Sequence, residues 1–305
     1  PFIGLYNAGA ALFRAQGNSK ISMLSSLVMN VVNIGGNAVL IYGFKMGVMG
    51  AALASLVSRA IACFAVLYLL QKPDCPLRVD GLRALAPKAR LIRQILRVGI
   101  PAGIENGMFQ IGKLSVSSLT STLGTAAIAA NAVANTTSTF LNIPASAVGL
   151  AVLTVVGQCL GAGRQDEAIY YIKKLSVIAE AVIIGCCALV YILTRPVTML
   201  GGMEPESAKM CFYMIGWITV VKPIVWTLAF VPAYGMRAAG DVRFSMILSC
   251  ISMWLFRVTL CIYLCRVHGF GPIAVWIGMF TDWTVRGIVF TIRFKSRRWL
   301  AHEVV

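Results

Sequence analysis

The sequence is short of charge, and of acidic charge above all. Acidic and basic residues make up 12% of its 305 residues, and 11 acidic residues stand against 27 basic ones. It has two histidines, both outside the apolar stretches, and lacks the HExxH, GxSxG and GxxxxGK[ST] patterns of zinc hydrolases, serine hydrolases and ATP-binding loops. We therefore expect no enzyme, and an ion gradient as the energy source of any uphill transport.

Cysteine is present, but in no pattern that indicates a cross-link or a metal. The nine cysteines are scattered through and beside the apolar stretches, without CxxC or Cys/His spacing. Disulfide frameworks and zinc sites need such spacings. We expect buried free thiols, no bound metal and no cofactor other than a coupling ion.

Long hydrophobic stretches are what the sequence has in abundance. Hydrophobic residues make up 58% of the chain, and its mean hydropathy of +0.80 is far above that of soluble domains. Stretches of about 20 apolar residues can cross a bilayer as helices, so we predict an all-α, polytopic membrane protein. The predicted spans are residues 21–43, 47–70, 98–122, 126–156, 175–194, 210–233, 244–264 and 272–292.

The basic residues fall mainly on one side of these spans. If Arg14 and Lys20 face the cytoplasm and the spans alternate, the opposite side receives only Lys45, Arg195, Lys209 and Arg266. This asymmetry is that of the positive-inside rule. It predicts a cytoplasmic C-terminus and a bilayer, not nucleic acid, as the partner of the basic charge.

A repeat divides the chain. FRAQGNSKISM at 13–23 returns as MRAAGDVRFSM at 236–246, and each copy joins two apolar segments in the same orientation. Two homologous bundles related in this way form a two-lobe helical bundle of parallel six-helix repeats. We predict the remainder of an incomplete N-terminal lobe at 1–71, a cytoplasmic linker at 72–96 and a C-terminal lobe at 97–305, with the apolar residues 1–13 as the end of a fourth helix.

Polar residues at helical spacing form three stripes inside the predicted spans. Lipid-facing amides are costly, so these faces meet other helices or a water-filled cavity. We favour a shared hydrated cavity, and simple bonding between neighbouring helices is the alternative. The stripes include Asn106, Gln110 and Lys113; Asn131 and Asn135; and Ser26, Asn30, Asn33 and Asn37.

Ionisable residues inside the spans mark candidate site positions. Glu105 lies one turn beyond Pro101 beside an amide stripe. Desolvation there would favour its protonated form and a nearby Lys113 or Lys222 its ionised form, so Glu105 is a candidate proton-exchanging group. Lys222 lies near mid-depth, next to Pro223. Asp282 and Arg286, at i and i+4, are predicted to form an ion pair along their own helix.

Several long motifs resemble those of the multidrug and toxic compound extrusion (MATE) transporters. LRVGIPAGIENGMFQIGKL, and the stretch from Leu123 through the GQxLGAG loop at 157–163, resemble family helices seven and eight. PAYGMRAAGD, DWTVRGIVFTIRFKSRRW and NVVNIGGNAVLIYGFKMGVMGAALA are similar to helices ten to eleven, twelve, and five to six. The resemblance covers essentially the whole chain.

The resemblance implies a twelve-helix, two-lobe antiporter that exports cationic or amphipathic organic compounds in exchange for protons or sodium ions. Glu105 matches the acidic residue of helix seven, and Asn131 and Asn135 fall in the polar region of helix eight. Two departures stand out: residues 210–233 carry Lys222 and no acid where some members place an Asp, and the family's first-helix acid would precede Pro1.

The function predicted is therefore multidrug efflux by alternating access, with Glu105 coupling the ion and Asn106, Gln110, Lys113, Asn131, Asn135 and Lys222 lining the substrate cavity. The alternative is a flippase or exporter of a lipid-linked or anionic metabolite, because basic residues outnumber acidic ones inside the spans. The sequence supports two further classes, a membrane enzyme and a purely structural membrane protein, less well. We expect a monomer in the bacterial plasma membrane, with a small-molecule substrate.

Overall fold

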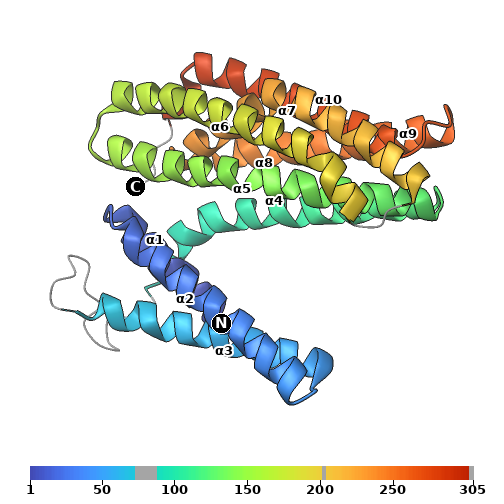
Figure 1. Cartoon of the computed structure of the whole chain (residues 1–305). Helices are drawn as coiled ribbons and strands as arrows, with labels where there is room; N and C mark the ends of the chain where they lie inside the picture. The colour runs from blue at the N-terminus through green and yellow to red at the C-terminus, as the bar shows by residue number, and fades with distance from the viewer. Residues whose placement is uncertain (73–87, 201–203, 302–305) are drawn as a thin grey trace. The chain divides into compact units, whose positions relative to one another are not determined.

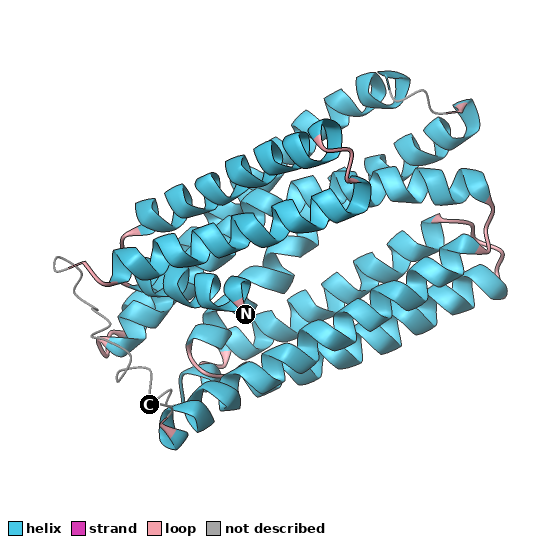
Figure 2. Ribbon diagram, turned by 90° about the horizontal axis from the view of Figure 1, so that it is seen from below, coloured by secondary structure: helices cyan, strands magenta, loops and turns pink. Residues whose placement is uncertain are grey.

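The computed structural model describes residues 1–72, 88–200 and 204–301, and this part of the chain contains helices and no strand (Figure 2). The chain divides into two compact units, Pro1–Ala89 and Arg90–Val305. The first unit contains α1 (Phe2–Ala15), α2 (Ser19–Asn37), η1 (Ala38–Gly43) and α3 (Gly47–Leu70). The second contains α4 (Ala89–Ser121), α5 (Thr125–Gly161), α6 (Gln165–Leu200), α7 (Pro205–Ala238), α8 (Val242–Ile251), η3 (Ser252–Thr259), α9 (Leu260–Arg266), α10 (Ile273–Lys295) and η4 (Arg298–Ala301) (Figure 1).

Seven helical segments of the described residues are long and apolar enough to cross a membrane. They match seven of the eight predicted spans, and the all-α, polytopic fold class is confirmed. The eighth prediction, 98–122, lies in α4, which is 33 residues long but falls short in hydropathy because its apolar run is interrupted by Glu105, Asn106, Gln110 and Lys113.

The start of α4 differs from the prediction. Residues 89–96, assigned to the linker, continue without a break into the helix that carries Pro101. The sequence from Ala89 to Arg97 consists of good helix formers, and Pro101 is tolerated within the helix. Residues 73–87 of the predicted linker lie outside the described residues, and the lobe boundaries stay a prediction.

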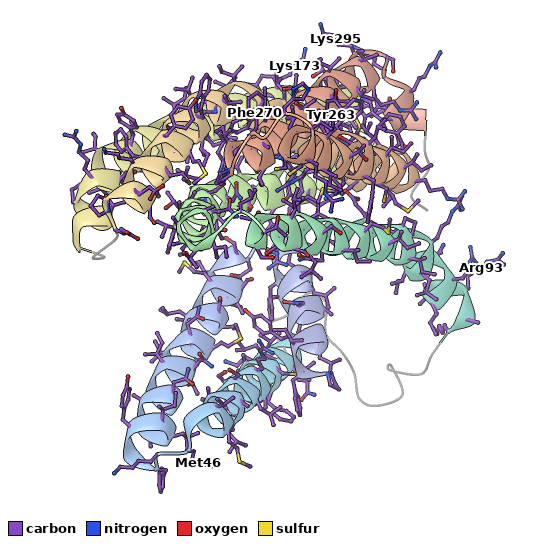
Figure 3. The ribbon with its side chains drawn as sticks, turned by 90° about the vertical axis from the view of Figure 1, so that its right-hand side faces the viewer. Met46, Arg93, Lys173, Tyr263, Phe270 and Lys295 are labelled. Atoms are coloured by element: carbon purple, nitrogen blue, oxygen red, sulfur yellow. The ribbon has the colours of Figure 1, made fainter. Side chains whose placement is uncertain are left out.

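In the first unit, α3 packs against both α1 and α2. Its core joins Tyr6, Ala10 and Phe13 of α1 to Val66 and Leu70 of α3. Figure 3 shows Met46 at the turn that leads from η1 into α3. The α1 segment contributes a core stripe at helical spacing, although it is too short to be a candidate span.

In the second unit, α7 packs against α5, α6 and α10. Trp276 and Phe290 of α10 and Met214 and Ile218 of α7 are almost fully buried there. The helix α4 is attached differently: its backbone makes no extended close approach to another described helix. Long side chains bridge it to the rest of the unit, as where Met253 packs against Gly112.

The two copies of the repeat have the same turn geometry. Gly17 and Gly240 both have positive φ angles, +78° and +85°. The N–H of the next residue, Asn18 or Asp241, donates to a carbonyl five residues earlier at 3.0 Å in both turns. Arg14 donates to Ser22 at 3.0 Å, and Arg237 donates to Ser245 at 3.3 Å. The repeat seen in the sequence is therefore also a repeat of hydrogen bonds.

Candidate functional site

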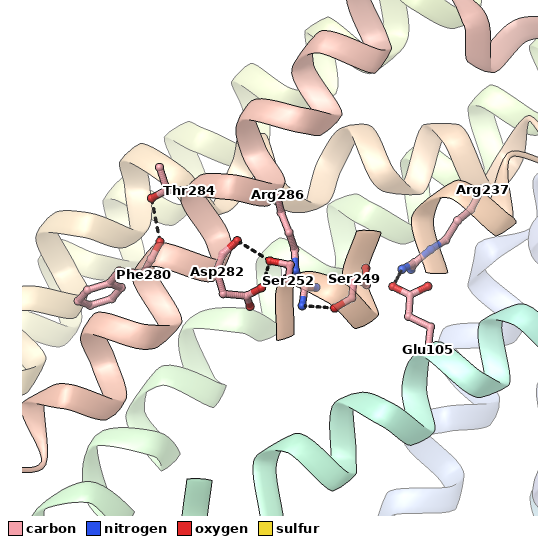
Figure 4. A network of polar contacts seen from close by, with 8 residues as sticks. All are labelled: Glu105, Arg237, Ser249, Ser252, Phe280, Asp282, Thr284 and Arg286. Atoms are coloured by element: carbon pink, nitrogen blue, oxygen red, sulfur yellow. Dashed lines mark hydrogen bonds and ion pairs between the residues drawn. The ribbon is translucent and has the colours of Figure 1, made fainter. Parts of the chain in front are cut away.

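Glu105 is buried on α4 and forms an ion pair with Arg237 in the last turn of α7. Arg237 Nη2 lies 2.5 Å from Glu105 Oε1, and the two side chains are 31% and 10% exposed. Figure 4 shows the two side chains pointing toward one another from their separate helices. The guanidinium also lies 5.7 Å from the ring of Tyr234. This pair ties α4 to the turn between α7 and α8.

The two lysines expected near Glu105 have other neighbours. Lys113 is exposed, and its ammonium lies 5.5 Å from the centre of the Phe109 ring. Lys222 is fully buried, donates to the Ser138 carbonyl at 3.1 Å and lies 6.0 Å from the Trp283 ring. Its ammonium lies between α5, α7 and α10, and its place in the substrate cavity stays a prediction.

The amide residues of α4 and α5 differ in burial. Asn106 and Gln110 are exposed on the second unit, and Asn106 donates to the Ala102 carbonyl at 2.9 Å. Asn131 is buried with no hydrogen-bond partner for its side-chain oxygen. Asn135 donates to the Asn131 carbonyl at 2.9 Å. These two hydrogen bonds each stay within one helix and do not join the amides of α4 to those of α5, and the place of the four residues in one cavity stays a prediction.

The amides of α2 bind a neighbouring helix. Asn33 donates to Ser55 at 3.3 Å and to Ser58 at 3.4 Å, and Asn37 donates to Asn33 at 3.1 Å. The two bonds from Asn33 join α2 to α3 within the first unit, and the bond from Asn37 lies within α2. For this stripe the alternative, bonding between neighbouring helices, describes what the structure holds.

Asp282 and Arg286 form an ion pair along α10, at the spacing that suggested it. Arg286 Nε donates to Asp282 at 2.8 Å, and the two side chains are only 4% and 0% exposed. Ser252 of η3 donates to the same carboxylate, and Arg286 donates to the Ser249 carbonyl at 3.2 Å. Figure 4 shows this cluster joining α10 to α8 and η3.

The contacts of three residues in the polar interior were not predicted from the sequence. Arg237 was read as part of a basic loop, and Arg293, which binds the buried Asp241 at 3.0 Å, as a cytoplasmic charge. Arg257 is only 6% exposed, and its Nε has no hydrogen-bond partner. The repeat motif was a usable signal for Arg237 and Asp241, because both stand inside it.

Two grooves among the described residues of the second unit offer little polar chemistry. One of about 730 Å³ runs between α6 and α7 past Cys187, Tyr191 and Trp217. Another of about 560 Å³ runs between α7 and α10 past Trp217, Phe270 and Phe280. No group of His, Cys, Asp and Glu side chains able to hold a metal occurs among the described residues. The ion pairs of Glu105 and Asp282 described above involve α4, α8 and η3 instead.

These features define a multi-pass membrane protein with a helical fold and a charged interior. A family model described as MatE matches residues 101–263, more than half of the chain. The chain belongs to the MatE family, and the resemblance to the MATE transporters is confirmed.

Known relatives and structures agree with this assignment. The chain is 29% identical over 287 residues to "Probable multidrug resistance protein YoeA" of Bacillus subtilis, covering 91% of this chain and 61% of YoeA. It is 25% identical over 303 residues to "Probable multidrug resistance protein NorM" of Thermotoga maritima, covering 97% of this chain and 64% of NorM. The chain thus spans less than two thirds of the length of these relatives.

The fold is that of solved transporters. A structure described as an outward-facing multidrug resistance MATE family transporter of the MOP superfamily matches with a TM-score of 0.85 and 21% identity, covering 96% of this chain and 65% of that one. A MOP superfamily transporter from Pyrococcus furiosus matches with a TM-score of 0.83 and 22% identity, with the same coverage of each chain.

Proposed function

We propose that this chain serves secondary active efflux, exporting cationic or amphipathic organic compounds in exchange for protons or sodium ions by alternating access. Membership of the MatE family supports this, as do the names of relatives called multidrug resistance proteins. The observation that carries the proposal within this chain is the ion pair between Glu105 and Arg237.

Glu105 is the proposed ion-coupling residue. A proton or a sodium ion bound at its carboxylate competes with Arg237, since one negative charge cannot hold both at full strength. Because α4 is bridged to its unit by side chains, loss of this pair releases α4 from the α7–α8 turn. Ion binding is thereby linked to movement of a helix, which alternating access requires.

The test is substrate efflux by the full-length protein with Glu105→Gln. We expect efflux to lose its dependence on the ion gradient, because the amide neither ionises nor binds the ion. Glu180→Gln is the matched control: Glu180 is another partly buried carboxyl, on α6, with no ion pair to a described residue. Wild-type efflux by Glu105→Gln across roughly pH 5.5 to 8.5 would remove Glu105 from the mechanism.

A second candidate is export of an anionic or lipid-linked compound. The buried or enclosed cations Lys222, Arg257 and Arg286 favour it, because a cage for cationic substrates is expected to be lined with carboxylates. The Pyrococcus furiosus transporter is described as having a binding pocket of reverse polarity that suggests a different function. Transport assays with one cationic and one anionic dye separate the two candidates.

We further propose the orientation and setting of the chain. The C-terminus faces the cytoplasm of a bacterial plasma membrane, because the basic residues gather on that side. The protein works as a monomer with a small-molecule substrate, without nucleic acid and with no cofactor beyond the coupling ion. Reporter fusions after residue 305 test the orientation. If a reporter that works only in the cytoplasm is inactive there, the proposed orientation is wrong.

A further inference from the structure

Three basic side chains from three elements surround one aromatic ring in the second unit. Their charged groups lie 5.5 Å (Lys113, α4), 5.6 Å (Arg257, η3) and 5.9 Å (Arg286, α10) from the centre of the Phe109 ring. Each distance is within the range of a cation–π contact. We call this group the Phe109 cluster: Phe109, Lys113, Arg257 and Arg286.

The negative charge within reach does not balance these cations. Asp282 is the carboxylate bonded to the cluster: its Oδ1 accepts from Arg286 and from Ser252, and its buried Oδ2 has no hydrogen-bond partner. Glu105, one turn from Phe109 on α4, is held by Arg237 at 2.5 Å. Among the described residues, therefore, the cluster carries three positive charges against one negative charge. Such an excess is costly inside a membrane unless a counter-charge is supplied.

Arg257 is the residue that most needs that counter-charge. It is only 6% exposed, its Nε is buried without a hydrogen-bond partner, and its guanidinium donates no hydrogen bond to a described residue. A Cβ on Gly278 would lie 2.9 Å from the Arg257 carbonyl, so η3 and α10 are in direct backbone contact. This contact fixes the position of the Arg257 main chain. A buried, fixed guanidinium with free donors has the geometry that binds carboxylates and phosphates.

One member of the cluster is exposed. Lys113 and Gln110 are exposed on α4, and the α4 backbone makes no extended close approach to η3 or α10. Lys113 is thus the exposed cation of the cluster and Arg257 a buried one. The Phe109 ring beside them offers an apolar surface.

We propose that the Phe109 cluster is a binding site for the carboxylate or phosphate group of an amphipathic molecule. The group bonds Arg257 and Lys113, while Arg286 remains on Asp282. Two sources share this chemistry, a free anionic solute and the headgroup of an anionic lipid. The proposal concerns binding alone, so it stands or falls separately from ion-coupled efflux.

Binding is tested on the purified full chain in nanodiscs. In phosphatidylcholine discs, inorganic phosphate and acetate are titrated by calorimetry. In discs that also contain phosphatidylglycerol, retained lipid is counted by native mass spectrometry. We expect at least one arm to show binding that weakens about tenfold or more in Arg257→Gln, the loss expected for one charge-assisted hydrogen bond. Phosphate binding identifies a solute site, and retained phosphatidylglycerol identifies a lipid site.

Arg266→Gln is the matched control, since it removes an exposed positive charge from α9 outside the cluster. Equal binding by wild type, Arg257→Gln and Arg266→Gln, or no binding in either arm, overturns the proposal. If binding is weak, the temperature of thermal unfolding provides a second test of the proposal. In anion-free phosphatidylcholine discs, Arg257→Met should unfold at a higher temperature than wild type, because an unbalanced buried charge is removed. A lower unfolding temperature would mean that Arg257 is part of a balanced structural network, and would also overturn the proposal.

Discussion

Helices α3 and α10 occupy equivalent places in the two copies of the repeat, and they bury the same face with different chemistry. Five buried positions of α3 align in order with five buried positions of α10. They are Gly50, Ala54, Ser58, Ala62 and Val66 in α3, and Ala274, Gly278, Asp282, Arg286 and Phe290 in α10.

The difference lies in the middle of that face. In α3, Ser58 accepts a hydrogen bond from Asn33, so a neutral contact joins the two helices. In α10, the aligned Asp282 accepts from Ser252 of η3 and from Arg286 of α10 itself, so the equivalent position is charged. The arrangement of helices is compatible with either chemistry. It follows that the fold requires a close fit at this face, and that the charges of α10 are an addition to it.

The largest effect is expected from Asp282→Ala. This change leaves Arg286 buried without its carboxylate partner, a loss that costs about 3–5 kcal/mol for a broken buried pair. Thermal unfolding in detergent should show a large drop. The aligned change in α3, Ser58→Ala, removes one neutral hydrogen bond and should cost about 1 kcal/mol.

Copying the chemistry of α3 into α10 sharpens the comparison. The double variant Asp282→Ser, Arg286→Ala installs the pair found at Ser58 and Ala62, and it should recover most of the stability lost in Asp282→Ala. If the double variant unfolds at the same temperature as Asp282→Ala, then the fold does need the ion pair, and the interpretation of α10 given above is wrong.

A smaller difference is expected between the two arginines of the repeated turns. Arg237→Ala leaves Glu105 buried without its partner and should cost about 1–3 kcal/mol, whereas Arg14→Ala loses one bond to Ser22 and should cost about 0.5–1.5 kcal/mol. Unfolding temperatures measure both. Adding Glu105→Gln should rescue Arg237→Ala, and absence of rescue would show that the guanidinium matters through its other contacts.

The smallest effect should be the same in both copies. Gly17→Ala and Gly240→Ala each place a Cβ on a residue with positive φ and should cost about 1 kcal/mol. Equal losses in unfolding temperature would support equivalent turns. A clear inequality would mean that one turn relaxes on substitution, and that its hydrogen bonds are not fixed as they are in the other.

Features that depend on local sequence could be predicted, because periodicity is written along the chain. The helices, the repeat at Arg14 and Arg237, and the spacing of Asp282 and Arg286 are of this kind. Contacts between distant segments could not. Glu105 pairs with a residue 132 positions away, and Lys222 binds a main-chain carbonyl of Ser138, a partner that has no sequence signature.

The early start of α4 is a different case, because its signal is local. The prolines and charges before Arg97 indicate a linker, whereas the helix propensity of the residues continues back to Ala89. The surroundings of Arg257, by contrast, depend on contacts between distant segments and could not be predicted. Its burial and its unpaired Nε result from the close packing of η3 on α10 around Gly278, which only the assembled helices show.

Both copies of the repeat contain a π-helical segment, η1 in one and η3 in the other. A π turn holds more residues than an α turn, so side chains beyond it are rotated about the axis relative to an uninterrupted α-helix. The rod from Val242 to Arg266 therefore presents two faces that no single helical wheel describes. Scanning mutagenesis of this rod must be indexed separately before Ser252 and after Thr259, or lipid-facing and interior substitutions will be exchanged.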